Sequence, residues 1–149
     1  MHLGIALRLS FVLVSLAPVT EACSCRPPPP PAVAARASAA VFIGRVVSTR
    51  PSWSGARPSE AESDSAHLVV TFRVAARWRG AAGATVIVRT DWARCGFPFE
   101  ARDTFLVYAN LVRGQLWTNR CTRTTELSGA AYDLEGLGRP RSGAIPRGA

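Results

Sequence analysis

Hydrophobic residues recur at every second position between residues 67 and 78. A period of two indicates a strand with one buried face, because successive side chains of a strand point to opposite sides. Leu68, Val70, Phe72, Val74 and Trp78 share the apolar face, and Thr71, Arg73 and Arg77 share the polar one. We therefore expect a half-buried strand at 67–78 whose apolar face, Trp78 included, packs on the core.

Four further runs rich in β-branched and aromatic residues predict strands at 41–47, 85–90, 104–109 and 114–118. Gly44 lies inside the first of them and predicts a bulge or a sharp bend. The longest polar segment, 50–66, predicts a loop. Five short strands with a long first connection predict a mainly β fold, an OB-like five-stranded β-barrel. The spacing alone equally allows a sandwich.

Two helices are expected to flank these strands. The alanine-rich stretch 32–40 predicts a short helix, and the five prolines before it favour an extended segment. Leucines interleaved with acidic residues predict a C-terminal helix at 124–137, which Gly129 and Gly136 interrupt. Residues 138–149 are rich in Gly, Pro and Arg, and we expect them to be disordered.

Residues 1–22 have the layout of a secretory signal peptide. An apolar run at 9–17 follows a weakly basic start, Pro18 breaks the run, and small residues precede a cleavage after Ala22. The run is shorter than the ~20 residues that span a bilayer. We therefore expect cleavage, a mature domain at 23–137 with no membrane span, and a secreted, extracellular or periplasmic location. An uncleaved N-terminal anchor is the alternative.

Export changes how the four cysteines, at positions 23, 25, 95 and 121, are interpreted. An even number in an exported chain predicts a disulfide framework. A Cys23–Cys25 bridge would close a strained ring, so both cysteines reach distant partners and two pairings remain open. A zinc site is the competing hypothesis. It needs closely spaced ligand pairs, whereas Cys95 and Cys121 are far apart and the mature chain has one histidine, His67.

The formal net charge of +8 raises the hypothesis of a polyanionic partner. Every basic residue is arginine, and the arginines are spread along the chain, so we assign them to a solvated surface. Trp53, Trp78, Trp92 and Trp117 offer rings on which bases stack. However, Trp78 belongs to the apolar strand face, and export with disulfides argues against nucleic acid, so we expect no nucleic-acid partner.

Catalytic chemistry is not indicated. His67 stands at a strand start with no evident acid–base partner, and a surface histidine is the simpler interpretation. The sequence contains no visible Ser-His-Asp set, phosphate loop or metal-ligand cluster. We expect a protein that is not an enzyme and that uses no cofactor.

The start of the mature chain, Cys23-Ser24-Cys25-Arg26-Pro27, resembles that of tissue inhibitors of metalloproteinases, which open Cys-Thr-Cys-x-Pro. The segments ASAAVFIGRVVS, FEARDTFLVYA and CTRTTEL resemble the first strand, a later strand and the end of that family's N-terminal domain. The similarity covers roughly 23–137 and places the chain among netrin-like domains. The Cys-x-Cys at a mature N-terminus is its specific part.

The resemblance implies the pairs Cys23–Cys95 and Cys25–Cys121. It also implies an inhibitory edge in which the α-amine and carbonyl oxygen of Cys23 chelate the zinc of a protease. Ser24 would then enter the specificity pocket, while Cys25 and Pro27 support the edge. The chain departs from the family in lacking the third disulfide and the C-terminal subdomain, and Arg26 replaces an apolar residue.

Two alternatives to an inhibitor follow from the same residues. The cysteines of the N-terminal arm would serve only as staples in a non-inhibitory extracellular module that binds another protein. Lipidation of Cys23 would give an anchored lipoprotein, and acylation would block the amine. The expected partner is accordingly a zinc metalloproteinase or another extracellular protein. The sequence leaves the oligomeric state open.

Overall fold

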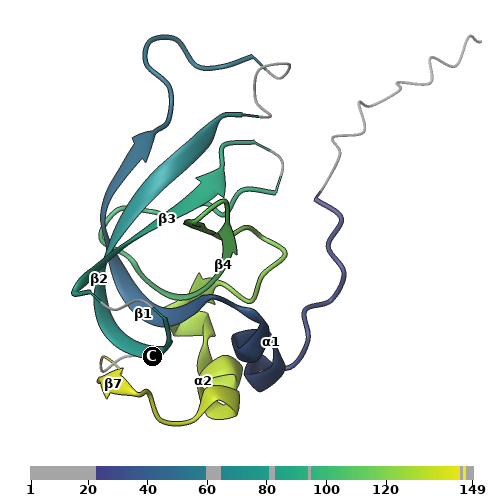
Figure 1. Ribbon diagram of the computed structural model, residues 1–149, viewed down its shortest axis with the longest axis vertical. Helices are drawn as coiled ribbons and strands as arrows, with labels where there is room; N and C mark the ends of the chain where they lie inside the picture. Colours follow the sequence, from purple (N-terminus) through teal and green to yellow (C-terminus); the bar gives the residue numbers. More distant parts are fainter. Residues whose placement is uncertain (1–22, 60–64, 81–82, 94, 145, 147–149) are drawn as a thin grey trace, which may run out of the picture.

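A computed structural model describes residues 23–59, 65–80, 83–93, 95–144 and 146. The predicted signal peptide and part of the predicted loop 50–66 lie outside the described residues. In the described part of the chain, helix α1 precedes five main strands, and a short C-terminal part follows them (Figure 1). The elements are α1 (Pro31–Ala37), β1 (Ala40–Pro51), β2 (His67–Arg79), β3 (Thr85–Asp91), β4 (Thr104–Val112), β5 (Gln115–Trp117), β6 (Thr125–Glu126), the 3-10 helix η2 (Leu127–Gly129), α2 (Ala131–Leu137) and β7 (Ser142–Gly143).

The five main strands form a closed ring. Their order is β1-β2-β3-β5-β4, and β4 pairs back onto β1. Within the ring, β3 and β5 run parallel and the other neighbours run antiparallel. This closure confirms the predicted fold class, a mainly β, OB-like arrangement of five strands with flanking helices and two disulfides.

The interior of the ring is an aromatic core. Phe42 of β1, Phe72 of β2 and Phe105 of β4 are buried there, together with Phe99 from the β3–β4 connection. The Phe99 ring meets those of Phe72 and Phe105 edge to face, with centroids 5.1 and 5.0 Å apart. Such pairs add about 0.5–1.5 kcal/mol beyond the area they bury. The packing therefore ties three strands to one loop.

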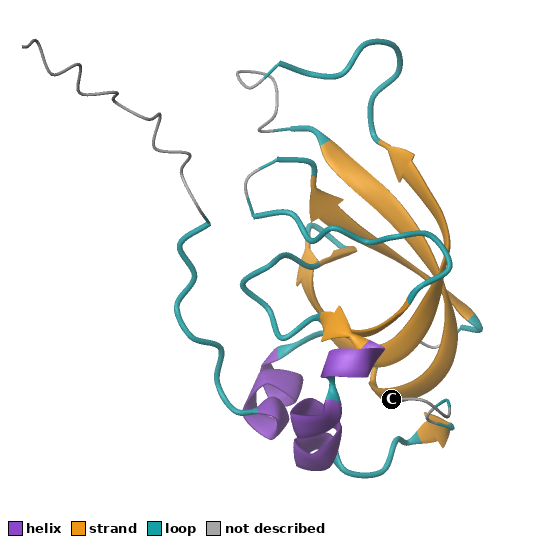
Figure 2. Cartoon of the chain, turned by 180° about the vertical axis from the view of Figure 1, so that it is seen from behind, coloured by secondary structure: helices purple, strands orange, loops and turns teal. Residues whose placement is uncertain are grey.

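A second apolar layer lies outside the ring, beneath the two helices (Figure 2). Val41 and Ile43 of β1 point into it, while their neighbours point into the ring interior, so β1 is buried on both faces. Ala34 of α1 and Leu134 of α2 cover this layer. The two helices pack closely at Gly136, where an added Cβ would lie 2.9 Å from Pro31.

Strand β2 departs from the simple alternation that the sequence predicts. Ile43 pairs with Ala76 and Gly44 pairs with Val74, so Ala75 is an extra residue in β2. An extra residue moves all later side chains to the opposite face. Trp78 is buried as predicted, but it lies in the outer layer, where its Nε1 donates to the Gly138 carbonyl at 2.8 Å. The prediction that Trp78 shares a face with Phe72 is wrong for this reason.

Several element boundaries also differ from the predictions. The first strand extends to Pro51, past the predicted start of the loop, because its last residues pair with β2. The C-terminal helix is confined to α2, since Thr125 and Glu126 pair with β4 instead. In the tail, β7 pairs with Ala76 and Arg77 of β2, so disorder is the wrong prediction for this part.

None of the helices in the described part of the chain is long and apolar enough to cross a membrane.

The register of β1 and β2 shifts between Ile43 and Gly44, where the sequence predicts a bulge or bend, although the extra residue, Ala75, lies in β2. The close packing at Gly44 generates a stability prediction. An added Cβ at Gly44 would lie 2.9 Å from the Phe72 Cβ and from the Phe42 ring, so Gly44→Ala forces two strands apart. Overpacking of this kind costs about 1–3 kcal/mol. Chemical denaturation should show that loss in the free energy of unfolding. The control Gly129→Ala, whose nearest neighbour would be 3.4 Å away, should cost less; equal losses would contradict the packing argument.

Candidate functional site

The N-terminal segment is joined to the ring by two disulfides. They pair Cys23 with Cys95 and Cys25 with Cys121, with Cα atoms 5.2 and 5.1 Å apart. The pairing that the resemblance implies is therefore confirmed. The bridges span 72 and 96 residues, and constraining such loops stabilises a fold by about 2–4 kcal/mol per bridge. They also indicate an oxidising compartment.

The four sulfur atoms form one compact group. The Sγ atom of Cys23 lies 3.5 Å from those of Cys25 and Cys121, beyond its own bond to Cys95. Three of these cysteines have the proximity of metal ligands. Metal binding by cysteine requires thiolates, and all four sulfurs are committed to disulfides. In this state the group acts as a cross-link.

The two loops that carry the partner cysteines are joined to each other. The Arg120 backbone N–H donates to the Cys95 carbonyl at 2.8 Å, and its Nε donates to the Gly96 carbonyl at 3.0 Å. Gly96 approaches the Asp91 carbonyl so closely that an added Cβ would lie 1.8 Å from that oxygen. Only glycine fits this contact. The loops therefore present Cys95 and Cys121 as one unit.

Hydroxyl groups anchor the Cys121 segment to β4. The Thr118 and Thr124 Oγ1 atoms both donate to the Tyr108 carbonyl, at 2.9 and 3.2 Å. The Tyr108 N–H in turn donates to Thr124 Oγ1 at 3.0 Å. Next to the disulfide, the Asn119 Oδ1 accepts from the Cys121 N–H at 2.9 Å. The segment is thus fixed on a buried strand.

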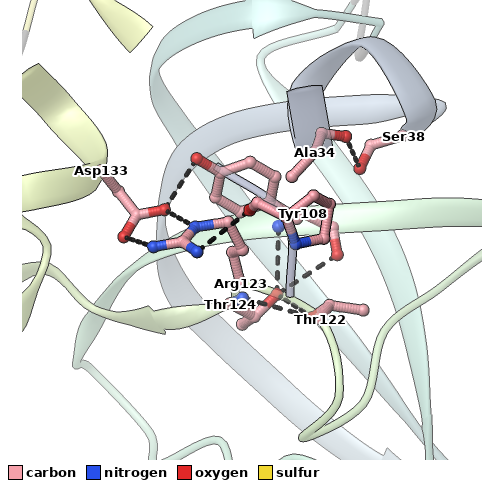
Figure 3. Close-up of polar contacts among 8 residues, drawn as sticks. Ala34, Ser38, Tyr108, Thr122, Arg123, Thr124 and Asp133 are labelled. Atoms are coloured by element: carbon pink, nitrogen blue, oxygen red, sulfur yellow. Dashed lines mark hydrogen bonds and ion pairs between the residues drawn. The ribbon is translucent and has the colours of Figure 1, made fainter. Parts of the chain in front are cut away.

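A partly buried ion pair connects this segment to α2 and to the proline run (Figure 3). Arg123 binds the Asp133 carboxylate through two parallel contacts, of 2.6 Å from Nε and 3.0 Å from Nη2. Its Nη1 donates to the Pro29 carbonyl at 3.1 Å. The Tyr108 hydroxyl donates to the same carboxylate at 2.9 Å. Arg123 therefore holds the extended proline segment against the ring.

The network shifts the proton affinities of its members. Burial raises the pKa of Tyr108 far above its usual value, and the hydrogen bond to Asp133 raises this pKa further. The hydrogen bond to Asp133 also raises the pKa of Arg123. Both groups therefore keep their protons in the folded protein, and the carboxylate keeps both of its donors.

The candidate edge at the N-terminus is partly open to solvent. Cys23 and Cys25 are half-buried, whereas Ser24, Arg26 and Pro27 are exposed. The structure brings Cys23, Ser24 and Cys25 together on one extended segment that two disulfides fix. Arg26 places a positive charge beside it.

A pocket at one end of the ring was missed by the sequence analysis. It has a volume of about 640 Å³, and its lining includes the first residue of β2 and the last residue of β3. In Figure 1 these two strand ends lie at the opposite end of the ring from α1 and α2. His67, Asp91, Asn110, Arg113, Gln115 and Trp117 line it. Here His67 is half-buried, faces Asp91 in the strand register, and has its ring centroid 5.1 Å from that of Trp117.

His67, which the sequence analysis interprets as a surface histidine, is half-buried and lines this pocket. Its Nδ1 lies 3.2 Å from the Ser65 carbonyl, which can only accept, so Nδ1 donates. The polar residues at the ends of successive predicted strands were the feature of the sequence that could have indicated this pocket. The ring closure that brings β4 and β5 beside them could not be inferred from alternation alone.

No protein-family model matches the chain, and no curated protein matches it either. The resemblance to netrin-like domains consequently rests on the residues quoted above, and the family remains a prediction.

The buried network generates a prediction about alkaline pH. The pKa of Tyr108 is higher in the folded than in the unfolded chain, so the unfolded chain loses this proton first as the pH rises. The contribution to stability is complete below about pH 10, the usual tyrosine pKa, and declines above it by up to about 1.4 kcal/mol per pH unit. Urea denaturation between about pH 8 and 11 should show this decline.

Tyr108→Phe should remove this component of the alkaline decline and cost about 1 kcal/mol at neutral pH, through the lost hydrogen bond. Tyr132→Phe is the matched control because Tyr132 is exposed. The two variants should differ in alkaline slope, and identical slopes would contradict the assignment.

Proposed function

We propose that the mature protein is a secreted inhibitor of zinc metalloproteinases that acts through a free N-terminal Cys23. The observation that carries the proposal is the exposed Ser24 on an extended segment fixed at both neighbouring cysteines by disulfides. The resemblance of Cys23-Ser24-Cys25-Arg26-Pro27 to the family's opening supports the same role. The disulfides and the predicted signal peptide support secretion.

The chemistry requires a protease whose zinc keeps an open coordination position. The α-amine and carbonyl oxygen of Cys23 would occupy it and displace the water that attacks substrate. Ser24 would direct its hydroxyl into the adjoining specificity pocket. The segment is held in place before binding by two disulfides and by the Arg123–Pro29 contact, which lowers the ordering cost of association.

The second candidate is a non-inhibitory module that binds another extracellular protein. Exposed Arg26 favours it, since a charge stands where the inhibitor family has an apolar residue beside the protease. In that case the disulfides only staple the N-terminal arm to the ring.

The test compares the mature chain starting at Cys23 with a chain carrying one additional alanine before it. The mature chain should inhibit members of a panel of zinc endopeptidases near pH 7.5, and the extended chain should lose more than about tenfold in potency. Both should have the same melting temperature, because the ring and its disulfides are unchanged.

A matched chemical control exploits the absence of lysine in this chain. Acetylation of the mature protein modifies the α-amine of Cys23 as its one primary amine, and it should abolish inhibition without unfolding. Inhibition should also weaken below about pH 7.7, where a terminal amine of ordinary pKa is protonated. Equal potency of the free and acetylated proteins, or no inhibition by the free one, would favour the non-inhibitory module.

A further inference from the structure

We propose that the pocket at the end of the ring is a binding site for a neutral oligosaccharide. This site is separate from the N-terminal edge and does not depend on the inhibitor function. Its place in the fold, its unpaired polar groups, its charge, its aromatic ring and its strained rim residue all bear on the assignment.

The pocket is built from strand ends. His67 opens β2, Asp91 closes β3, and Trp117 closes β5. Asn110 lies near the end of β4, opposite Trp117 in the register. Because backbone pairing fixes each of these positions, the side chains are held on a rigid frame. A site on paired strands is pre-organised for its ligand, and OB folds use their strand surfaces and adjoining loops for oligomeric ligands.

Much of the hydrogen-bonding capacity of the pocket is unused. Within the described part of the chain, the side chains of Asp91, Asn110 and Gln115 have no hydrogen-bond or ion-pair partner. With Nδ1 of His67 donating to Ser65, the neutral ring leaves Nε2 as an acceptor. Two amides, one carboxylate and one imidazole thus offer donors and acceptors side by side. That mixture matches hydroxyl groups, which both donate and accept.

The formal charges favour a neutral ligand over an anionic one. Asp91 carries one negative charge and Arg113 one positive charge, so the two cancel within the lining. A site for phosphates would instead concentrate arginines and exclude a carboxylate. The pocket therefore differs in chemistry from a nucleic-acid groove.

Trp117 supplies the apolar component. It is half-buried, and its indole contacts the His67 ring at a tilt of 52°. An aromatic side chain with part of its surface left accessible offers an apolar platform beside polar groups. The carbon-bound hydrogens of a pyranose ring pack on such a platform while its hydroxyls reach the surrounding amides. A phosphate or a free carboxylate has no apolar face that could pack on this indole ring.

The turn at the rim of the pocket retains a strained residue. Arg113 and Gly114 form the two-residue connection between β4 and β5, with φ of 49° and 77°. Such turns strongly prefer Asn-Gly, because L side chains other than Asn and Asp adopt positive φ at a cost. Strain of this kind concentrates at ligand-binding sites. We assign Arg113 the role of donating to ligand hydroxyls.

A second hollow of about 430 Å³ adjoins the pocket and shares Ser65 with it. It is lined by Trp53 and Arg57, and the Arg57 guanidinium lies 4.3 Å from the centroid of Trp92. Trp53 and Trp92 meet edge to face, with centroids 5.0 Å apart. Another aromatic surface therefore continues from the pocket. Two adjoining subsites suit a chain of sugars better than a monosaccharide.

The test uses the complete disulfide-bonded protein and a panel of neutral hexasaccharides: cello-, chito-, xylo-, malto- and laminari-hexaose. At least one should bind saturably below about 10 mM in calorimetry and quench tryptophan fluorescence. The affinity should change little between about 50 and 500 mM salt, since no phosphate is neutralised. The matching monosaccharide should bind more weakly than the hexasaccharide.

Two variants locate the site. Trp117→Ala should weaken binding more than about tenfold. Arg113→Asn should also weaken binding, yet raise the melting temperature because asparagine suits the turn better. Arg102→Asn is the matched control: Arg102 is exposed, also has positive φ, at 75°, and does not line the pocket. It should leave the affinity unchanged.

Three results would overturn the proposal. The first is the absence of saturable binding by every hexasaccharide of the panel. The second is binding by folded Trp117→Ala and by Arg113→Asn that is as strong as binding by the unchanged protein. The third is tight, steeply salt-dependent binding of a single-stranded oligonucleotide that Trp117→Phe weakens and that every sugar fails to displace. A higher melting temperature with lost affinity in Arg113→Asn separates a ligand role from a structural one.

Discussion

Strand β1 is the constraint on which the rest of the structure depends. It pairs with β2 along one edge and with β4 along the other, so its backbone closes the ring. It is also buried on both faces: Phe42 points into the ring interior, and Val41 points beneath the helices. A residue with a Cβ at Gly44 would meet both Phe42 and Phe72. The closure of the ring and the packing of both apolar layers thus depend on this one strand, β1.

The second layer explains why the N-terminal arm has a defined place. Tyr108 lies on β4, its ring is buried beneath the helices, and its hydroxyl meets Asp133 of α2. Asp133 orients Arg123, which binds the Pro29 carbonyl. A buried carboxylate without these partners would be strongly destabilising. The buried Tyr108 therefore helps to position the segment that carries the candidate edge, because its partner Asp133 also orients the arginine that binds this segment.

The sequence predicted what depends on local pattern and missed what depends on closure. Alternation located β2 and placed Phe72 in the core, because period two is a local property. It placed Trp78 on the wrong face of β2, because the extra residue Ala75 reverses the alternation of the side chains that follow it. The local pattern of residues does not indicate this bulge. The disulfide pairing came from the family resemblance, since chain geometry left two pairings open. The pocket combines ends of β2, β3 and β5, and their proximity follows from ring order.

The two candidate sites share one support. The segment that leaves β5 lines the pocket with Asn119, and the Oδ1 atom of the same Asn119 accepts from the backbone of Cys121. Cys121 in turn holds Cys25 of the N-terminal edge. A ligand that engaged the Asn119 amide group would therefore contact the residue that positions this disulfide. Because hydroxyls of Thr118 and Thr124 fix the segment to buried β4, we expect it to respond as a rigid support.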